Sequence, residues 1–273
     1  MLAGLLYLAA DLLVRLLPAR TADGLAVWIA RRAFALRVPA RARLEQNLAH
    51  LLECEPGPQL QAVAGEAFDN FALSFTDFLR LGHAPPGRLA EAVEVHGAEH
   101  LEAARASRRG VILLSAHLGN WELGAAWLAA GGTPLHLVAR PHPSPWVERF
   151  FARRRHAWGV RLMPDRPLWR PAAAALRRCE WVALMADREA SARGTGRRTS
   201  VCAWAAALAR RTGALVLPAV ILRLPDGRYA VHFERPLESA AVRADGFGDS
   251  LRRHLQRHPR QWSAFEALPE GVA

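Results

Sequence analysis

Short apolar segments alternate with helical stretches over the second two-thirds of this chain. Residues 111–114 and 181–186 are continuously apolar, as expected for strands buried on both faces of a sheet. Residues 214–224 form a third, longer apolar run, and residues 120–130 and 203–212 between these runs have the character of helices. This alternation predicts an α/β fold with a mostly parallel central sheet flanked by helices.

One pair of strands is expected to run antiparallel. Pro225-Asp-Gly is a turn signal that follows the long apolar run directly. Residues 229–233 after the turn alternate between apolar and polar side chains, as in a half-buried strand. We therefore predict a hairpin at this turn, which makes the sheet mixed.

The first part of the chain has a helical pattern instead. Residues 58–81 carry apolar side chains at steps of three and four, which predicts an amphipathic helix. We expect residues 1–85 to form a helical cap and anchor, and residues 86–273 to form the α/β unit. Because there is no long linker, the two parts are expected to make one integrated fold.

Two apolar segments near the N-terminus indicate a membrane anchor. The first is interrupted at Asp11 and closed by Pro18, so it is shorter than the roughly 20 residues that a span needs. The second, residues 24–36, is cut by Arg31 and Arg32. Short apolar helices that end in arginine are typical of a monotopic anchor, whose apolar face enters the bilayer while the arginines meet anionic headgroups. A helical hairpin packed on the core and a single span that tolerates Asp11 are the alternatives.

The chain is strongly basic. Its 36 basic residues, all arginine, stand against 25 acidic ones and give a formal net charge of +11. Such an excess indicates an anionic partner: nucleic acid, acidic lipid, or a phosphorylated or acidic carrier. The chain has neither interleaved basic and aromatic strands nor a helix-turn-helix signal, so we do not expect nucleic acid. Its three cysteines form no CxxC pair, which argues against a disulfide framework or a zinc knuckle.

The segment after the first buried strand carries the chemistry. His117 follows this strand directly, where open α/β sheets place their ligands, and Asn120 is a good N-cap for the next helix. Glu122 in the first turn of that helix could fold back and accept a hydrogen bond from His117. The second ring nitrogen would then be free to take a proton from a hydroxyl group. A structural histidine beside a helix-start glutamate is the alternative. No further ligand cluster supports a metal.

These residues resemble a known family. His-Leu-Gly-Asn-Trp-Glu, residues 117–122, resembles the HFGNWE signature of the bacterial lipid A late acyltransferases. They belong to the wider lysophospholipid and glycerolipid acyltransferase group with the H-x4-(D/E) motif, and the phosphatidylinositol-mannoside acyltransferases are close relatives. Further matches follow in order along the chain: Arg140-Pro141, Arg155 before Gly159, a strand ending at Asp187, and the P-x-Q-W of residues 259–262.

The resemblance implies an O-acyltransferase. His117 would be the general base, Glu122 would orient it, and the activated oxygen would attack the thioester of an acyl-carrier-protein or CoA donor without an acyl-enzyme. The thioester is a co-substrate, and no other cofactor or metal is implied. The oxyanion would be stabilised by amides at Gly119 and Asn120 or by Arg155. The remaining expected substrate contacts are Trp121, Arg140, Arg155, Asp187 and Arg188, where Arg140 and Arg155 would meet phosphates and Asp187 would hold one of these arginines.

The acceptor is expected to be a membrane glycolipid. The resemblance favours a lipid A precursor, with a phosphatidylinositol-mannoside-like lipid, lysophosphatidate, or a non-catalytic lipid-binding role as alternatives. It also places the chain at the inner membrane, with its catalytic face in the cytoplasm. After Asp187 the chain departs from the family: Arg188 stands where glutamine is usual, and the Phe-Phe-Gly stretch is missing.

Overall fold

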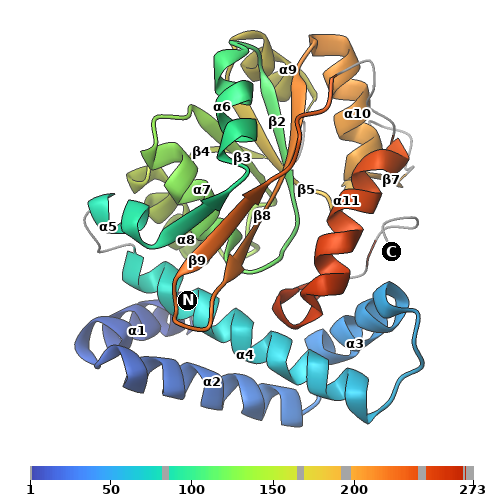
Figure 1. Cartoon of the computed structure of the whole chain (residues 1–273). Helices are drawn as coiled ribbons and strands as arrows, with labels where there is room; N and C mark the ends of the chain where they lie inside the picture. The colour runs from blue at the N-terminus through green and yellow to red at the C-terminus, as the bar shows by residue number, and fades with distance from the viewer. Residues whose placement is uncertain are drawn as a thin grey trace.

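A seven-stranded sheet forms the centre of the molecule (Figure 1). The computed structural model describes residues 2–81, 86–164, 169–191, 198–238, 244–266 and 268. The sheet order is β1-β9-β8-β2-β5-β3-β4, and a separate antiparallel pair, β6 and β7, follows β5 in the chain. The strands are β1 (Val93–His96), β2 (Val111–Ser115), β3 (Leu135–Ala139), β4 (Arg161–Pro164), β5 (Trp181–Met185), β6 (Glu189–Ser191), β7 (Arg198–Ser200), β8 (Leu215–Arg223) and β9 (Tyr229–Phe233).

The sheet is mixed and mostly parallel, as predicted. Every pairing in it is parallel except that of β8 with β9. The antiparallel pair is the hairpin expected at Pro225-Asp-Gly, in which Arg223 lies opposite Tyr229. Because β8, β2, β5, β3 and β4 run in one direction, their carboxyl ends meet at the same edge of the sheet.

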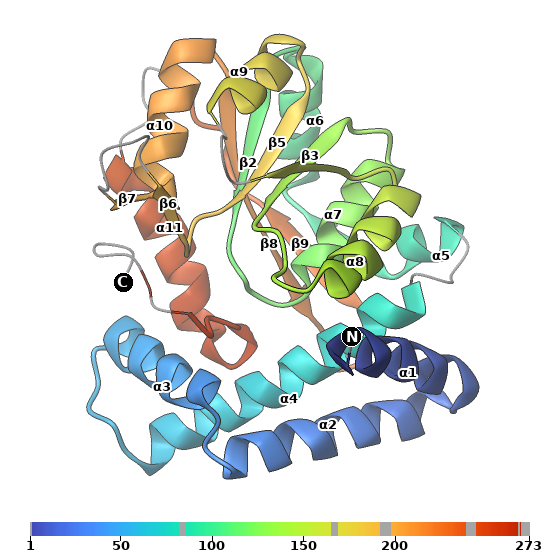
Figure 2. The same cartoon turned by 180° about the vertical axis from the view of Figure 1, so that it is seen from behind.

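Helices cover both faces of the sheet, which explains the continuous apolar runs. Ile112 and Leu114 on β2 pack in one core with α10 and α11, whereas Val111 and Leu113 pack in the other with α6 and α7. Figures 1 and 2 show these two layers on opposite sides of the strands. The helices of this part are α5 (Pro86–Glu91), α6 (Ala98–Ala106), α7 (Trp121–Ala130), α8 (Pro145–Ala157), α9 (Trp169–Arg177), α10 (Val201–Thr212), α11 (Ala244–Arg257) and the short 3-10 turn η1 (Pro259–Gln261).

Four N-terminal helices lie beneath the carboxyl edge of the parallel strands (Figure 1). They are α1 (Leu2–Leu16), α2 (Ala19–Ala35), α3 (Pro39–Leu52) and α4 (Pro58–Leu81), the last with the predicted bounds. Asp77 on α4 accepts hydrogen bonds from Tyr229 and Arg223, so α4 is tied to the sheet edge. In the described part of the chain, no helix combines the length and apolar character of a membrane span.

Candidate active site

The register of two parallel strands brings His117 and Asp187 together. Ser115 at the end of β2 lies opposite Met185 at the end of β5. His117 comes two residues after Ser115, and Asp187 comes two residues after Met185. The Nδ1 atom of His117 lies 2.8 Å from Oδ1 of Asp187. The backbone amide of His117 donates a 3.0 Å hydrogen bond to Oδ2 of the same carboxylate. The histidine is therefore held by both its ring and its backbone.

This pairing corrects two expectations. The carboxylate that bonds the ring of His117 is Asp187, which we expected to hold an arginine, and not Glu122. The side chain of Glu122 is bound instead by Arg155. Glu122 sits in the first turn of α7, and Arg155 comes from α8.

Asp187 is an ionised acceptor in a buried site. Burial favours its neutral form, but the charge and hydrogen bonds of His117 and the indole N–H of Trp262 lower the pKa of Asp187 to about 2. An ionised carboxylate can only accept hydrogen bonds, so Nδ1 of His117 carries the proton. When the ring is neutral, this tautomer leaves a lone pair free on Nε2 of His117, as a general base needs.

A C-terminal strap, residues 261–266, closes over this pair. Trp262 is fully buried and donates a 2.9 Å hydrogen bond from Nε1 to Oδ2 of Asp187. The next residue, Ser263, donates its amide to the carbonyl of His117 at 2.8 Å. Trp262 lies in the P-x-Q-W motif of residues 259–262, but we did not expect this residue at the site. Its late position in the chain carries no signal of contact with Asp187.

Gly119 allows a close backbone approach in the loop between β2 and α7, and its amide is not free to bind an oxyanion. Its amide donates to the carbonyl of Gln261 at 2.9 Å, so the hydrogen that we expected to face the oxyanion is engaged with the strap. Gly119 has φ of 62°, and a Cβ atom there would lie 2.0 Å from the carbonyl oxygen of Ile221. Only glycine fits this close approach.

Asn120 and Trp121 complete the start of α7. The Asn120 side chain accepts from the amide of Leu123 as the predicted N-cap, and its amide group donates to the Ser74 carbonyl and the Tyr229 hydroxyl. Asn120 thus joins α7, α4 and β9. Trp121 stands edge-on to the His117 ring, with ring centroids 4.8 Å apart, so it forms a wall beside the histidine.

Arg155 holds α8 to α7. Its Nε lies 3.0 Å from Oε2 of Glu122, its Nη2 bonds Oε1, and both side chains are largely buried. Burial by itself would lower the pKa of Arg155, but the Glu122 carboxylate outweighs it, so the pKa is raised. This bidentate pair corrects the expectation that Arg155 meets a phosphate or an oxyanion.

Arg140 and Arg188 meet at the strap. They follow the neighbouring strands β3 and β5, and both guanidinium groups contact the carboxylate of Glu266. Burial and the nearby charge of Arg140 lower the pKa of Arg188, although Asp187 opposes this. The structure therefore brings these two expected residues together at Glu266. The departure from the family between Arg188 and β7 falls mostly at residues 192–197, which lie outside the described residues.

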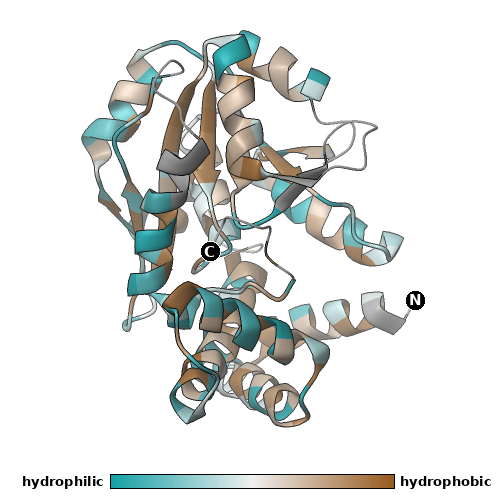
Figure 3. Ribbon diagram, turned by 90° about the vertical axis from the view of Figure 1, so that its right-hand side faces the viewer, coloured by the Kyte–Doolittle hydropathy of each residue, from teal (hydrophilic) through white to brown (hydrophobic). Residues whose placement is uncertain are grey.

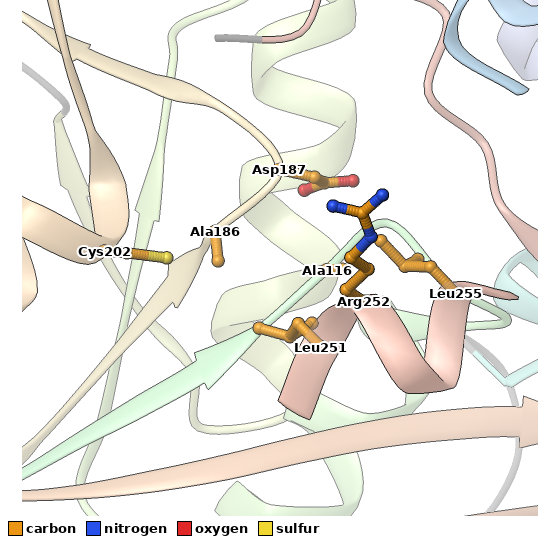
Figure 4. A pocket seen from close by; sticks show the side chains of 7 residues that line it. All are labelled: Ala116, Ala186, Asp187, Cys202, Leu251, Arg252 and Leu255. Atoms are coloured by element: carbon orange, nitrogen blue, oxygen red, sulfur yellow. The ribbon is translucent and has the colours of Figure 1, made fainter. Parts of the chain in front are cut away.

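A small, mostly apolar cavity lies behind Asp187. It is lined by side chains from the ends of β2 and β5 and from α10 and α11, as Figure 4 shows: Ala116, Ala186, Asp187, Cys202, Leu251, Arg252 and Leu255. Burial raises the pKa of the Cys202 thiol to about 11, so this cysteine is a neutral wall residue. Within the described ranges, no group of three or more metal-ligating side chains comes together.

An α/β sheet with a histidine–carboxylate pair at its carboxyl edge is typical of enzymes that activate a hydroxyl group. The sequence profile of the bacterial lipid A biosynthesis acyltransferases matches residues 2–266. The chain belongs to this family and is an acyltransferase.

Two individual acyltransferase sequences agree with this assignment. The chain is 27% identical to a phosphatidylinositol mannoside acyltransferase from Mycolicibacterium smegmatis, over 98% of this chain and 90% of the relative. It is 27% identical to the lipid A biosynthesis lauroyltransferase of Escherichia coli, over 69% of this chain and 66% of that one. The crystal structure of the 1-acyl-sn-glycerophosphate acyltransferase PlsC from Thermotoga maritima aligns over 88% of this chain and 99% of its own, with a TM-score of 0.42 and 14% identity.

Proposed function

We propose that this acyltransferase moves a fatty acyl chain from a thioester to a hydroxyl of a membrane glycolipid, with His117 as general base. Nε2 of His117 removes the proton from the acceptor hydroxyl while the oxygen attacks the thioester carbonyl. The tetrahedral intermediate then collapses, the carbon–sulfur bond breaks, and the imidazolium returns the proton to the leaving thiolate. The products are an ester and a free thiol, and no acyl-enzyme forms.

The observation that carries this proposal is the 2.8 Å contact between Nδ1 of His117 and Asp187. It selects the tautomer with a basic Nε2 and places a negative charge beside the imidazolium that forms during transfer. Asp187 is thus a positioning residue. The family's thioester chemistry supplies the leaving group, from acyl carrier protein or CoA, and needs no other cofactor.

The acceptor is a glycolipid of one of two classes. The phosphatidylinositol mannoside acyltransferase aligns with nearly the whole chain, which favours an acceptor of that kind. The HLGNWE motif and the family profile favour a lipid A precursor instead. Either acceptor lies in a membrane while the thioester donor is cytoplasmic. We therefore propose that transfer takes place at the cytoplasmic face of the inner membrane.

Acyl transfer by the purified chain tests the reaction and the acceptor together. Lauroyl and palmitoyl thioesters of acyl carrier protein and of CoA are each offered to a phosphatidylinositol mannoside and to an under-acylated lipid A precursor, dispersed in detergent. We expect transfer to one acceptor class, with kcat lowered by about 10²–10⁴-fold in both His117→Ala and Asp187→Asn.

Two outcomes would contradict the proposal. Transfer by His117→Ala at the wild-type rate would exclude the histidine as base. Lipid that copurifies with the wild-type chain, without turnover of any of these donors, would support the non-catalytic lipid-binding alternative.

A further inference from the structure

A buried hydrogen-bond network joins α4, the β8–β9 hairpin and the start of α7, and its centre is the carboxylate of Asp77. Oδ2 of Asp77 accepts hydrogen bonds from the Tyr229 hydroxyl and from Nε of Arg223, the latter at 3.1 Å. Oδ1 accepts from Nη1 of Arg80 at 2.8 Å. The side chains of Asp77 and Arg223 are each 15% exposed, and Tyr229 is buried. One carboxylate on α4 therefore holds three donors, two of which come from the hairpin.

The register of the hairpin explains why two donors reach one carboxylate. Arg223 at the end of β8 lies opposite Tyr229 at the start of β9. Residues that lie opposite each other in an antiparallel pair place their side chains on the same face of the sheet. Ser74 and Asp77 are three positions apart, so they share one face of α4. The hairpin and α4 meet at this point, as Figure 1 shows for the two elements.

Tyr229 connects this network to Asn120, the N-cap of α7. Nδ2 of Asn120 donates to the Tyr229 hydroxyl at 3.2 Å and to the carbonyl of Ser74 at 3.0 Å, so both of its hydrogens are used. Oδ1 of Asn120 accepts from the amide of Leu123 at 3.2 Å. The orientation of the Asn120 amide group is therefore set by three partners on three different elements.

The protons of the network have a single arrangement. Burial and the charge of Asp77 raise the pKa of Tyr229, so the hydroxyl is protonated at neutral pH. Its one hydrogen goes to Asp77, because Asn120 presents a donor to the same oxygen. Burial would lower the pKa of Arg223, but the Asp77 carboxylate outweighs it and raises the pKa. Each member thus depends on its neighbours for a partner of the right kind.

Arg223 reaches the loop after His117 by a second route. The backbone amide of Arg223 donates to Oε1 of Gln261 at 2.8 Å, and Nε2 of Gln261 donates to the carbonyl of Arg223 at 2.9 Å. The carbonyl of Gln261 accepts the amide of Gly119. Gly119 and the residue that follows it are therefore both held by groups that lead back to Asp77.

The surroundings of the network make the loss of one member costly. Figure 3 shows mainly hydrophobic strands above N-terminal helices on which hydrophilic and hydrophobic residues alternate. A buried donor or acceptor that loses its partner costs more free energy than the hydrogen bond itself contributed. Removal of one member should therefore make the remaining groups move toward new partners.

We propose that Tyr229 and Asp77 are positioning residues for acyl transfer. Through Asn120 they set the wall that the first turn of α7 forms beside His117. This wall is Trp121, whose ring centroid lies 4.8 Å from that of the histidine. If Asn120 shifts, Trp121 shifts with it, because the two residues are consecutive and begin the same helix. The role rests on the proposed function in one respect, namely that His117 is the base.

Tyr229→Phe tests the role, because it removes the hydroxyl and keeps the ring. We expect kcat for acyl transfer to fall by about 10–100-fold, since a misplacement of about 1 Å can cost about 10²-fold in rate. KM should be nearly unchanged, because the variant slows the transfer step more than it weakens binding. Thr133→Val is the matched control: it removes a buried hydroxyl that accepts a 3.2 Å hydrogen bond from Arg105 beyond the opposite end of α7. The control should lose thermal stability but keep its kcat.

Asp77→Asn tests the centre of the network. The variant keeps an acceptor but loses the charge that Arg223 and Arg80 share. We expect kcat to fall as in Tyr229→Phe, at a temperature well below the unfolding midpoint of each variant. Asp69→Asn is the control on the same helix, since Asp69 pairs with the largely exposed Arg31, and it should keep its kcat. Where Asp77→Asn does not fold, Tyr229→Phe decides.

A nuclear magnetic resonance signal reports the position of the wall without catalysis. The Cε1–H resonance of His117 is assigned by its absence from the spectrum of His117→Ala. Its chemical shift depends on the ring current of Trp121, which stands edge-on to the imidazole. We expect this resonance to shift in Tyr229→Phe and to stay in place in Thr133→Val.

Three results would overturn the positioning role. They are a wild-type kcat in folded Tyr229→Phe, an unshifted His117 resonance in that variant, and an equal loss of kcat in Thr133→Val. The proposed function fails separately, if the wild type transfers no acyl group or if His117→Ala transfers at the wild-type rate. A shifted His117 resonance in Tyr229→Phe would then still show that the network sets the wall beside the histidine.

Discussion

Trp262 donates its indole N–H to Oδ2 of Asp187, the carboxylate oxygen that the ring of His117 does not use, at 2.9 Å. The two oxygens of Asp187 are thus divided between the imidazole on one side and the indole with the His117 amide on the other. Because Trp262 is fully buried and its chain neighbour Ser263 bonds the carbonyl of His117, the strap holds both members of the pair in place. Under the proposed function, Trp262 would act on the chemistry through Asp187.

Replacement of Trp262 by phenylalanine should separate this hydrogen bond from packing. The ring remains but Oδ2 of Asp187 loses a donor, which should cost about 1.5–3 kcal/mol of unfolding free energy. We also expect kcat to fall about tenfold, or about 1.4 kcal/mol in the barrier, with KM nearly unchanged. Trp181→Phe, at the opposite end of the strand that leads to Asp187, is the matched control for the loss of an indole. An unchanged kcat in the folded Trp262→Phe variant would exclude the positioning role.

The stability of the fold should depend on the ionisation of Asp187 in acid. Its pKa is lowered from 3.8 to about 2, so its contribution is fully present above about pH 4 and is lost as the pH falls through about 2. The shift corresponds to about 2 kcal/mol. Urea unfolding of wild type and Asp187→Asn between these pH values should show a difference in unfolding free energy that shrinks toward acid. A difference that stays constant over this range would contradict the assignment.

Breaking the buried pair of Glu122 and Arg155 should destabilise the fold strongly, whereas replacing both residues by apolar ones should not. Glu122→Ala leaves the guanidinium buried without its partner, at a cost of about 3–5 kcal/mol. Glu122→Leu combined with Arg155→Met should recover most of this loss, because an apolar pair pays no desolvation penalty. Glu102→Ala breaks the exposed pair with Arg105 and should cost less than about 1 kcal/mol.

The kcat of the same double variant tests the role of Glu122. A folded double variant that transfers acyl groups would show that this glutamate serves the α7–α8 packing. If it folds and is inactive, Glu122 takes part in the reaction in the way that the H-x4-E motif first indicated.

Gly119→Ala should damage the site through a clash with the backbone. An added Cβ would meet the carbonyl oxygen of Ile221 at 2.0 Å, at a φ of 62° that L-residues avoid. Gly132→Ala is the matched control, since Gly132 has φ of 83° with nothing within 4 Å of its Cβ position. We expect Gly132→Ala to cost about 1 kcal/mol, the conformational term alone. Gly119→Ala should cost clearly more and also lower kcat; equal losses in thermal unfolding would contradict the close approach.

Local signals in the chain were enough to predict much of the architecture. Apolar runs at residues 111–114 and 181–186, the turn at Pro225-Asp-Gly, and the periodicity of residues 58–81 each predict one element from its own residues, and the structure confirms them. The position of His117 was predicted in the same way, because the end of a buried strand and the N-cap at Asn120 are both indicated by residues within a few positions of it. The membrane anchor expected from the arginine-ended apolar helices stays a prediction.

Contacts between residues that are far apart in the chain could not be predicted from such local signals. The spacing of His117 and Glu122 predicts their pairing, but the sheet register places Asp187 against the histidine, and Arg155 on α8 takes the glutamate. Sequence alone determined which strands and helices form and which histidine ends a strand, because those depend on neighbours along the chain. Only the tertiary structure decided which carboxylate bonds that histidine. A buried charged group needs an oppositely charged or hydrogen-bonding partner, and the packing of the fold sets which partner lies close enough.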